Sequence, residues 1–547
     1  MWECVVLILC TFTILVQGDE DWRLVNINQG PLRGRMDPKG GLYIFYNIPY
    51  ASAPTGADRF KAPLPPPVWL STFDAVDRGI TCPQPFYFLN LREDCLVANV
   101  FVPDTEETNL LPVLAYVHGG AYQYGNGLFE QFKDLVRTKK VIVVSLNYRL
   151  GVHGFLCLGT EGAPGNAGIK DQVAALRWIN KNIASFGGNP EDVTLAGCSA
   201  GSGSGVSTGA AGFQIDPIEN AKTYAKLLNF TDVDDLSSLE EFYRTASYEQ
   251  LMSRHDAMFS DGKSTILFGP CIERDIGQER VIKDAPMNVM KQGNYTNIPL
   301  LYGFTNMDGA LVLSFFETWK DQMNEKFSDF LPAELYFESE DVKEVVAQKV
   351  KKFYFGDDPI SEDNILLFIK YYTDVLFAYP MLRSLSTRVE ALGDTVYLFE
   401  YSFVDEDTPG FPHTDVRGAN HCSQLVAVMD EDVTNRTEEY KQMKQIMRDY
   451  WHNFILTGSP SSNDSGLPSW PPANAERAPH MSLGRVIELK EDILEDSVAL
   501  WDGIYEVHYR GPVLPATTDD PDSDGAVSLM LSNVMFATIL ISFYFTL

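Results

Sequence analysis

Apolar and polar positions follow two different periods in the first half of the chain. Apolar runs at residues 111–119, 141–146 and 193–196 have the length and composition of buried parallel strands. Between the last two runs, residues 171–186 place apolar side chains close to the 3.6-residue period of a helix, which Gly187 and Gly188 terminate. Strand, helix and strand in this order predict an α/β protein with a parallel sheet.

The second half is richer in helical pattern. Residues 365–385 and 437–456 follow the helical period, and residues 395–399 are a short strand candidate. No repeat or low-complexity linker interrupts the chain before Pro512, whereas residues 513–525, rich in Pro, Thr and Asp, predict a disordered stalk. We therefore expect one large domain over residues 19–512.

Both ends of the chain carry apolar segments. Residues 5–16 predict a secretory signal peptide over residues 1–18, and a signal anchor is the alternative because Glu3, with no Lys or Arg, precedes the apolar run. Residues 534–547 are apolar but shorter than the ~20 residues of a spanning helix. With small residues ahead of them, residues 526–547 predict the hydrophobic signal for a glycolipid (GPI) anchor, and a membrane helix is the alternative. Both place the protein at a membrane surface.

Composition narrows the class of protein. The 547 residues carry a formal net charge of −31, which argues against nucleic acid as a partner because acidic surfaces repel phosphate. Glycosylation sequons fit a secreted glycoprotein and lie at Asn229, Asn294, Asn435 and Asn463. The cysteines after the signal peptide are too few to form a disulfide scaffold in so long a chain.

A nucleophile elbow follows the third predicted strand. Gly197-Cys198-Ser199-Ala200-Gly201 comes directly after residues 193–196, the context that this motif requires. The flanking glycines leave room for a sharp turn that exposes the hydroxyl of Ser199 and aims the amide of Ala200 at the developing oxyanion.

A second motif, His118-Gly119-Gly120-Ala121, follows the first predicted strand. Small residues at such a position expose backbone amides toward a substrate carbonyl, although a plain glycine turn is the alternative. The two motifs in this order predict acyl transfer by a serine nucleophile.

The partners of Ser199 must lie downstream, because the usual order on such a fold is serine, acid, histidine. The histidines after Ser199 are His255, His413, His421, His452, His480 and His508. A lone histidine is more often structural or solvated than catalytic, so the residues alone do not choose among them.

Further motifs closely resemble those of the carboxylesterase/cholinesterase family, and above all the insect carboxylesterases. They are Ile48-Pro49-Tyr50-Ala51, Glu93-Asp94-Cys95-Leu96, Asn147-Tyr148-Arg149-Leu150-Gly151, Gly165-Asn166-Ala167-Gly168 and Phe186-Gly187-Gly188-Asn189-Pro190. The resemblance covers nearly the whole chain after the signal peptide. It implies an α/β-hydrolase fold with a large, mostly parallel central sheet flanked by helices and a helix-rich second half.

The resemblance also implies the remaining site residues. The family's acid segment, Gly-Phe-Thr-x-x-Glu/Asp-Gly, corresponds to residues 303–309 and assigns the acid to Asp308. Its Gly-x-x-His segment corresponds to residues 418–421 and assigns the base to His421. The implied oxyanion donors are Gly120, Ala121 and Ala200, with His118 a structural residue of the loop.

The implied reaction is hydrolysis of a small or medium neutral ester through an acyl-enzyme on Ser199, with no metal or organic cofactor. The family joins Cys82 to Cys95 around a short loop, which here contains no Trp and so argues against choline esters. The pairing of the other cysteines stays open; they are Cys157, Cys198, Cys271 and Cys422.

One segment departs from the family. The family has a helix behind the elbow and then a strand ending in Ser-Gly, and aligning that pair with Ser204-Gly205 leaves roughly twenty residues missing. Because a central strand and its cover would be lost, we expect poorer folding or weaker catalysis. The alternative function is therefore a catalytically impaired or non-catalytic surface binding or adhesion protein on the same fold, although Ser199, Asp308 and His421 are all retained.

Overall fold

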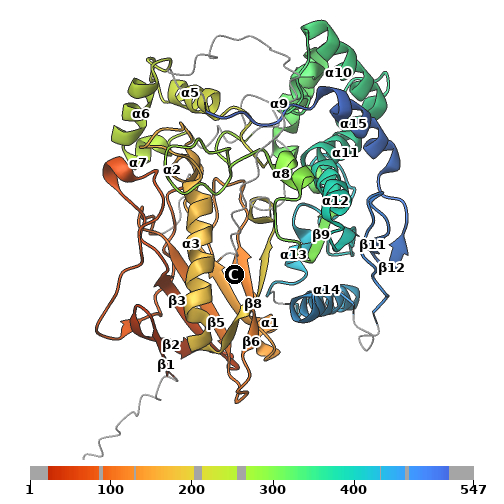
Figure 1. Ribbon diagram of the computed structural model, residues 1–547. Helices are drawn as coiled ribbons and strands as arrows, with labels where there is room; N and C mark the ends of the chain where they lie inside the picture. Colours follow the sequence, from red (N-terminus) through yellow and green to blue (C-terminus); the bar gives the residue numbers. More distant parts are fainter. Residues whose placement is uncertain are drawn as a thin grey trace, which may run out of the picture.

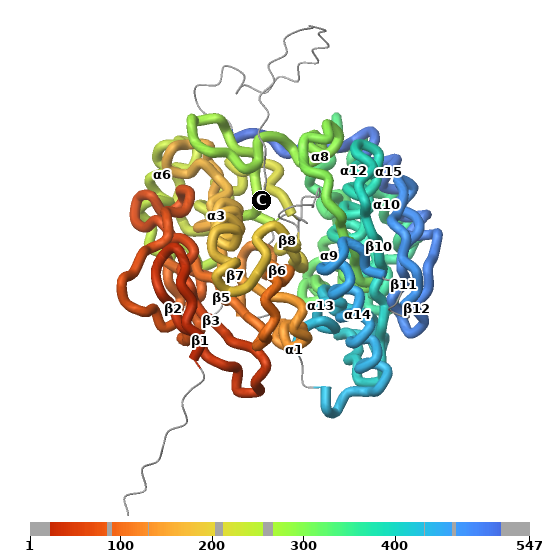
Figure 2. The backbone as a smooth tube through the Cα atoms, turned by 60° about the horizontal axis from the view of Figure 1, so that its bottom comes forward, coloured from red at the N-terminus to blue at the C-terminus, as the bar shows by residue number. Residues whose placement is uncertain are grey.

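The computed structural model describes residues 22–84, 90–128, 131–202, 212–254, 266–430, 433–461 and 467–515. The predicted signal peptide, the C-terminal hydrophobic signal, most of the stalk and Asn463 lie outside the described residues. Figures 1 and 2 show that the N-terminal part of the chain, red to yellow, and the C-terminal part, green to blue, lie side by side.

Eight strands form a mixed sheet in the N-terminal part. Their order is β1-β2-β3-β5-β7-β6-β8, and β4 pairs with β2. The strands are β1 (Trp22–Ile27), β2 (Gly30–Met36), β3 (Leu42–Pro49), β4 (Phe73–Asp74), β5 (Val97–Pro103), β6 (Leu111–Val117), β7 (Ile142–Leu146) and β8 (Gly188–Gly197). The three strands predicted from apolar runs are β6, β7 and β8, and β6 pairs in parallel with both of the others.

Four strands form a second sheet in the order β12-β11-β10-β9. They are β9 (Leu300–Thr305), β10 (Val396–Tyr401), β11 (His480–Leu483) and β12 (Ile487–Lys490). β10 pairs in parallel with β9 and β11. The strand predicted at residues 395–399 is thus β10, and the class of the fold is α/β as expected. The large sheet, expected to be mostly parallel, is mixed, because successive strands in the order β1-β2-β3-β5-β7 pair antiparallel.

Helices flank both sheets. They are α1 (Lys133–Arg137), α2 (Gly151–Phe155), α3 (Ala167–Asn182), α5 (Pro217–Leu227), α6 (Leu236–Thr245), α7 (Tyr248–Leu251), α8 (Pro286–Gln292), α9 (Phe316–Glu325), α10 (Glu340–Phe355), α11 (Ile365–Tyr372), α12 (Tyr379–Leu392), α13 (Ser423–Val426), α14 (Glu438–Thr457) and α15 (Glu495–His508). Figure 1 shows α3 lying across the larger sheet.

The predicted helix at residues 171–186 is α3 together with a 3-10 turn, Ile183–Phe186. It begins four residues earlier than predicted, because Asn166 takes a left-handed conformation that starts the helix at Ala167. On its buried face Asp171 accepts two hydrogen bonds from the Arg149 guanidinium, at 2.8 and 2.6 Å. This pair connects the strand-end motif around residue 149 to the helix.

The long helical pattern at residues 365–385 becomes two helices, α11 and α12, joined by a π-helical turn, Thr373–Ala378. Within the described residues, the stretch Glu362–Leu392 is long and apolar enough to cross a membrane by length and composition alone. However, 72% of its most apolar window is buried inside the protein, which identifies it as a core helix.

β8 lies at the edge of the larger sheet, and β9 lies at the edge of the smaller one. No pairing joins the two sheets across the described strands. Of the ten residues of β8 only Gly188 is buried, and Leu195 is 54% exposed, whereas almost every residue of the neighbouring β6 is buried. β8 is thus an edge strand with partly exposed apolar side chains, and Ser204-Gly205, where the sequence departs from the family, lies outside the described residues.

Candidate active site

The elbow has the geometry that its motif predicts. β8 ends at Gly197, Ser199 has a φ of 58°, and residues 200–202 are helical. A side chain at Gly197 would meet the backbone of Gly201, and one at Gly201 would overlap the carbonyl oxygen of Val117. Both glycines are therefore needed to hold Ser199 at the top of the strand in a strained conformation.

The second motif lies directly against the elbow. A Cβ on Gly119 would stand 2.7 Å from the carbonyl oxygen of Cys198 and 3.1 Å from Cβ of Ser199. Gly120 and Ala121 follow with positive φ angles of 108° and 53°. Within the described part of the chain, neither of their amides donates a hydrogen bond to a protein group, as oxyanion donors require.

His118 is a structural residue, as the resemblance implied. Its side chain is 1% exposed, and its ring stacks on that of Tyr148 with centroids 4.5 Å apart. Its Nδ1 lies 2.8 Å from the carbonyl oxygen of Gly119. Burial lowers the pKa of His118 to about 4, so the ring is neutral at neutral pH.

Asp308 and His421 meet, although their segments are far apart in sequence. Asp308 follows β9, is 3% exposed, and accepts a 2.8 Å hydrogen bond from the amide of Thr305 through Oδ2. Its Oδ1 lies 2.8 Å from Nδ1 of His421, in the loop that leads into α13. Because an ionised carboxylate only accepts, Nδ1 carries the proton and Nε2 presents its lone pair.

Nε2 of His421 is buried and has no hydrogen-bond partner among the described residues. The hydrogen bond from Ser199 to Nε2 is not formed in the structure, and such hydrogen bonds often tighten only when substrate binds. The ring of Phe377, from the π-helical turn, packs against the ring of His421 with centroids 4.5 Å apart. A buried Nε2 beside an aromatic ring is suited to accept a proton away from bulk water.

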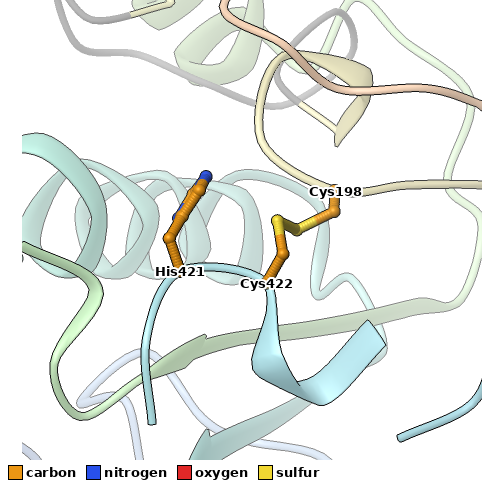
Figure 3. A group of neighbouring side chains, drawn as sticks. All are labelled: Cys198, His421 and Cys422. Atoms are coloured by element: carbon orange, nitrogen blue, oxygen red, sulfur yellow. A yellow bond between two sulfur atoms is a disulfide. The ribbon is translucent and has the colours of Figure 1, made fainter. Parts of the chain in front are cut away.

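Three disulfides are present in the described chain. Cys82 pairs with Cys95, as the resemblance implied, with Cα atoms 5.0 Å apart. The pairings left open by the sequence are Cys157 with Cys271 and Cys198 with Cys422. The last bond joins the residue before Ser199 to the residue after His421 (Figure 3).

Two groups of side chains have the ligand spacing of a metal site in the described residues. One is Cys198, His421 and Cys422, whose sulfur atoms are bonded to each other and so are not available as thiolate ligands. The other, Glu317, Glu362 and His413, is exposed and lies apart from the elbow residues. Neither group supplies a metal ligand set at Ser199.

Sequence reasoning missed the disulfide between the elbow and the loop of His421, and the packing of Phe377 against the ring of His421. Cys198 and Cys422 are separated by 224 residues, so no local pattern relates them. Phe377 lies in an apolar helical run in which nothing distinguishes it from core residues. The one signal in the sequence was the placement of each cysteine next to a candidate catalytic residue.

Comparison with known proteins agrees with this geometry. The sequence model of the carboxylesterase family matches residues 21–207 and 202–501, two segments that meet just after the elbow. The juvenile hormone esterase of Heliothis virescens is 29% identical and aligns over 86% of this chain and 91% of its own length. The para-nitrobenzyl esterase of Bacillus subtilis (strain 168) is 30% identical over 86% of this chain and 96% of its own length.

The crystal structure of juvenile hormone esterase from Manduca sexta, with OTFP covalently attached, superposes with a TM-score of 0.78. It is 26% identical and covers 89% of this chain and 100% of that one. The structural match confirms the α/β-hydrolase fold, and the matched segments contain the elbow, the loop of residues 118–121 and the Asp308–His421 pair. The chain belongs to the carboxylesterase family.

Proposed function

We propose that this carboxylesterase hydrolyses neutral carboxylic esters through an acyl-enzyme on Ser199, with His421 as base and Asp308 as its orienting acid. The observation that carries the proposal is the 2.8 Å contact between Asp308 and Nδ1 of His421, on a loop joined to the elbow by Cys198–Cys422. Family membership supports the reaction class, which is hydrolysis of a small-molecule ester.

The first half of the reaction forms the acyl-enzyme. Ser199 attacks the ester carbonyl carbon while Nε2 of His421 takes the hydroxyl proton. Asp308 stabilises the imidazolium that results. The amides of Gly120, Ala121 and Ala200 stabilise the oxyanion, and each donor of this kind contributes about 3 kcal/mol in the best-studied serine hydrolases.

The acyl-enzyme is complete when His421 gives its proton to the departing alkoxide. In the second half a water molecule attacks the acyl carbonyl with His421 again as the base, and His421 then returns the proton to Oγ of Ser199 as the carboxylic acid leaves. Every step uses groups of the chain and water alone, with no cofactor in the scheme.

Two observations support a neutral substrate. The described part of the Cys82–Cys95 loop, like its whole sequence, contains no Trp that would bind a quaternary ammonium group by its ring face. The ring of Phe377, with its centroid 4.5 Å from that of His421, adds an apolar surface beside the base. A para-nitrobenzyl ester, the kind of compound after which one relative is named, carries no charge on its alcohol group.

Labelling with a fluorophosphonate probe tests the proposal. The probe reacts with activated serines, so wild-type protein is expected to be labelled at Ser199 and Ser199→Ala to remain unlabelled. Ser202→Ala is the matched control, since Ser202 donates a 2.8 Å hydrogen bond to the carbonyl of Ser199 but has no chemical role. A folded, unlabelled wild-type protein would contradict the proposal and favour a non-catalytic surface-binding function.

We also propose that the chain enters the secretory pathway and is held at the cell surface by a GPI anchor. Three disulfides fit an oxidising compartment, and three of the four sequon asparagines are exposed: Asn229, Asn294 and Asn435. Treatment of cells with phosphatidylinositol-specific phospholipase is expected to release the enzyme, and a glycosidase is expected to increase its gel mobility. A protein retained on the membrane after the phospholipase would point instead to a membrane helix.

A further inference from the structure

The disulfide Cys198–Cys422 is placed where it can control the active site. Cys198 immediately precedes Ser199, and Cys422 immediately follows His421. The bond spans 224 residues of sequence and holds the two Cα atoms 6.2 Å apart. Figure 3 shows the ring of His421 beside the bonded sulfur atoms.

The bond joins two parts of the protein that no strand pairing connects in the described residues. Cys198 follows β8 at the edge of the larger sheet, and Cys422 precedes α13 in the part of the chain that carries the smaller sheet. Gln424 adds a 3.7 Å contact from Nε2 to the sulfur of Cys198. The other two disulfides touch neither loop, since they join Cys82 to Cys95 and Cys157 to Cys271.

The chemistry of the site depends on the distance that this bond sets. Proton transfer from Ser199 to Nε2 of His421 requires their approach to about 2.6–3.2 Å, and a displacement of about 1 Å can lower the rate roughly 100-fold. Asp308 orients the ring of His421 but does not contact Ser199. Among the described contacts, Cys198–Cys422 is the covalent connection between the nucleophile and the base.

We propose that Cys198 and Cys422 are positioning residues, and that a dithiol reductant opens their bond selectively and thereby slows attack by Ser199. This inference rests on the proposed function. Selectivity follows from access, because Cys422 is partly exposed whereas the four cysteines of the other disulfides are at most 1% exposed.

The redox step is a two-electron exchange. A thiolate of the dithiol attacks one protein sulfur, forms a mixed disulfide and releases the other protein sulfur as a thiolate. The second thiol of the reagent then displaces the first, so the reagent leaves as a cyclic disulfide. Cys198 and Cys422 are left as two thiols after the released thiolates take up protons, and an oxidised dithiol or glutathione disulfide reverses the exchange.

The test is a titration of the full chain with dithiothreitol. Free thiols are alkylated and located by peptide mass spectrometry, while fluorophosphonate labelling and ester turnover are followed in parallel. A chelator is included, because reduced Cys198 and Cys422 with His421 would have the spacing of a metal site. We expect this bond to open first, with a fall of about tenfold or more in the labelling rate constant that oxidation restores.

Three readouts separate positioning from general stability. On reduction kcat is expected to fall with little change in KM, and the rate should lose the pH dependence of a histidine base. The melting temperature and circular dichroism should show folded protein throughout. The double variant Cys198→Ser/Cys422→Ser should match the reduced enzyme and no longer respond to the reductant.

The outcomes are distinguishable. If peptide mapping shows that Cys198–Cys422 has opened and the labelling rate constant still lies within about twofold of its oxidised value, the inference is overturned. The proposed function is then left intact. Earlier opening of another disulfide, or loss of activity only together with loss of folded protein, also overturns it. Failure of the fully oxidised protein to label at all overturns both this inference and the proposed function.

Discussion

Asp308 holds the ring of His421 by a 2.8 Å contact to Nδ1 across 113 residues of sequence. The contact exists because β9 and β10 pair in parallel, so that the loops after both strands begin at the same end of the smaller sheet. It leaves Nε2 of His421 with no hydrogen-bond partner among the described residues, and so available for the proton transfer that we propose.

Asp308→Asn is expected to lower kcat about 10⁴-fold at neutral pH, because an amide in place of the carboxylate no longer fixes the productive tautomer of His421. The measurement is hydrolysis of para-nitrophenyl acetate, with the melting temperature showing that the variant folds. Full activity in this variant would show that Asp308 is not the acid that orients His421.

Gly201→Ala is expected to destroy the elbow, because its Cβ would overlap the carbonyl oxygen of Val117. We expect a loss of about 1–3 kcal/mol in the free energy of unfolding and loss of probe labelling. Gly503→Ala in α15 is the control, since nothing lies within 4 Å of its Cβ position. If the two variants showed the same free energy of unfolding and the same probe labelling, the steric explanation would be contradicted.

Arg149→Met is expected to destabilise the protein by about 3–5 kcal/mol, because it leaves the Asp171 carboxylate buried without its cation. The side chains of this pair are 3% and 0% exposed. Arg177→Met, which breaks an ion pair whose side chains are 52% and 68% exposed, should cost less than about 1 kcal/mol. Urea unfolding of both variants measures the difference.

Stability is expected to fall as the pH drops below about 6.5, in part because of His118. Burial lowers its pKa from 6.5 to about 4, so the unfolded chain binds the proton first. The contribution of His118 to stability is complete above the unfolded pKa and is lost as the pH falls through the folded pKa. The loss amounts to about 2 kcal/mol at pH 5. His118→Gln should remove that share of the pH dependence when unfolding is compared at pH 7 and pH 5.

Leu195→Lys is expected to raise the yield of soluble monomer, because a charge on an exposed edge strand opposes pairing with another chain. Leu195 is 54% exposed on β8. Val486→Lys adds the same charge at another exposed position, between β11 and β12, and should change the yield less. Size-exclusion chromatography after expression measures the yield of soluble monomer for both variants.

The sequence by itself determined the local parts of this protein. Apolar periodicity located β6, β7, β8, α3 and α14 to within a few residues, because strand and helix periods are properties of neighbouring positions. The glycines around Ser199 likewise predicted the elbow. Asp308 and His421 came only from resemblance to the family, since nothing local distinguishes one histidine from the other five after Ser199.

Only the tertiary structure decided what depends on distant segments meeting. It paired Cys198 with Cys422, placed Phe377 on His421, and left β8 at the edge of its sheet. Such relationships depend on how segments far apart in the sequence pack together, and that packing is a sum of many weak contacts with no sequence period. The elbow around Ser199 is therefore readable from the chain, whereas the contacts that bring Asp308, His421 and Cys422 together with it are properties of the fold.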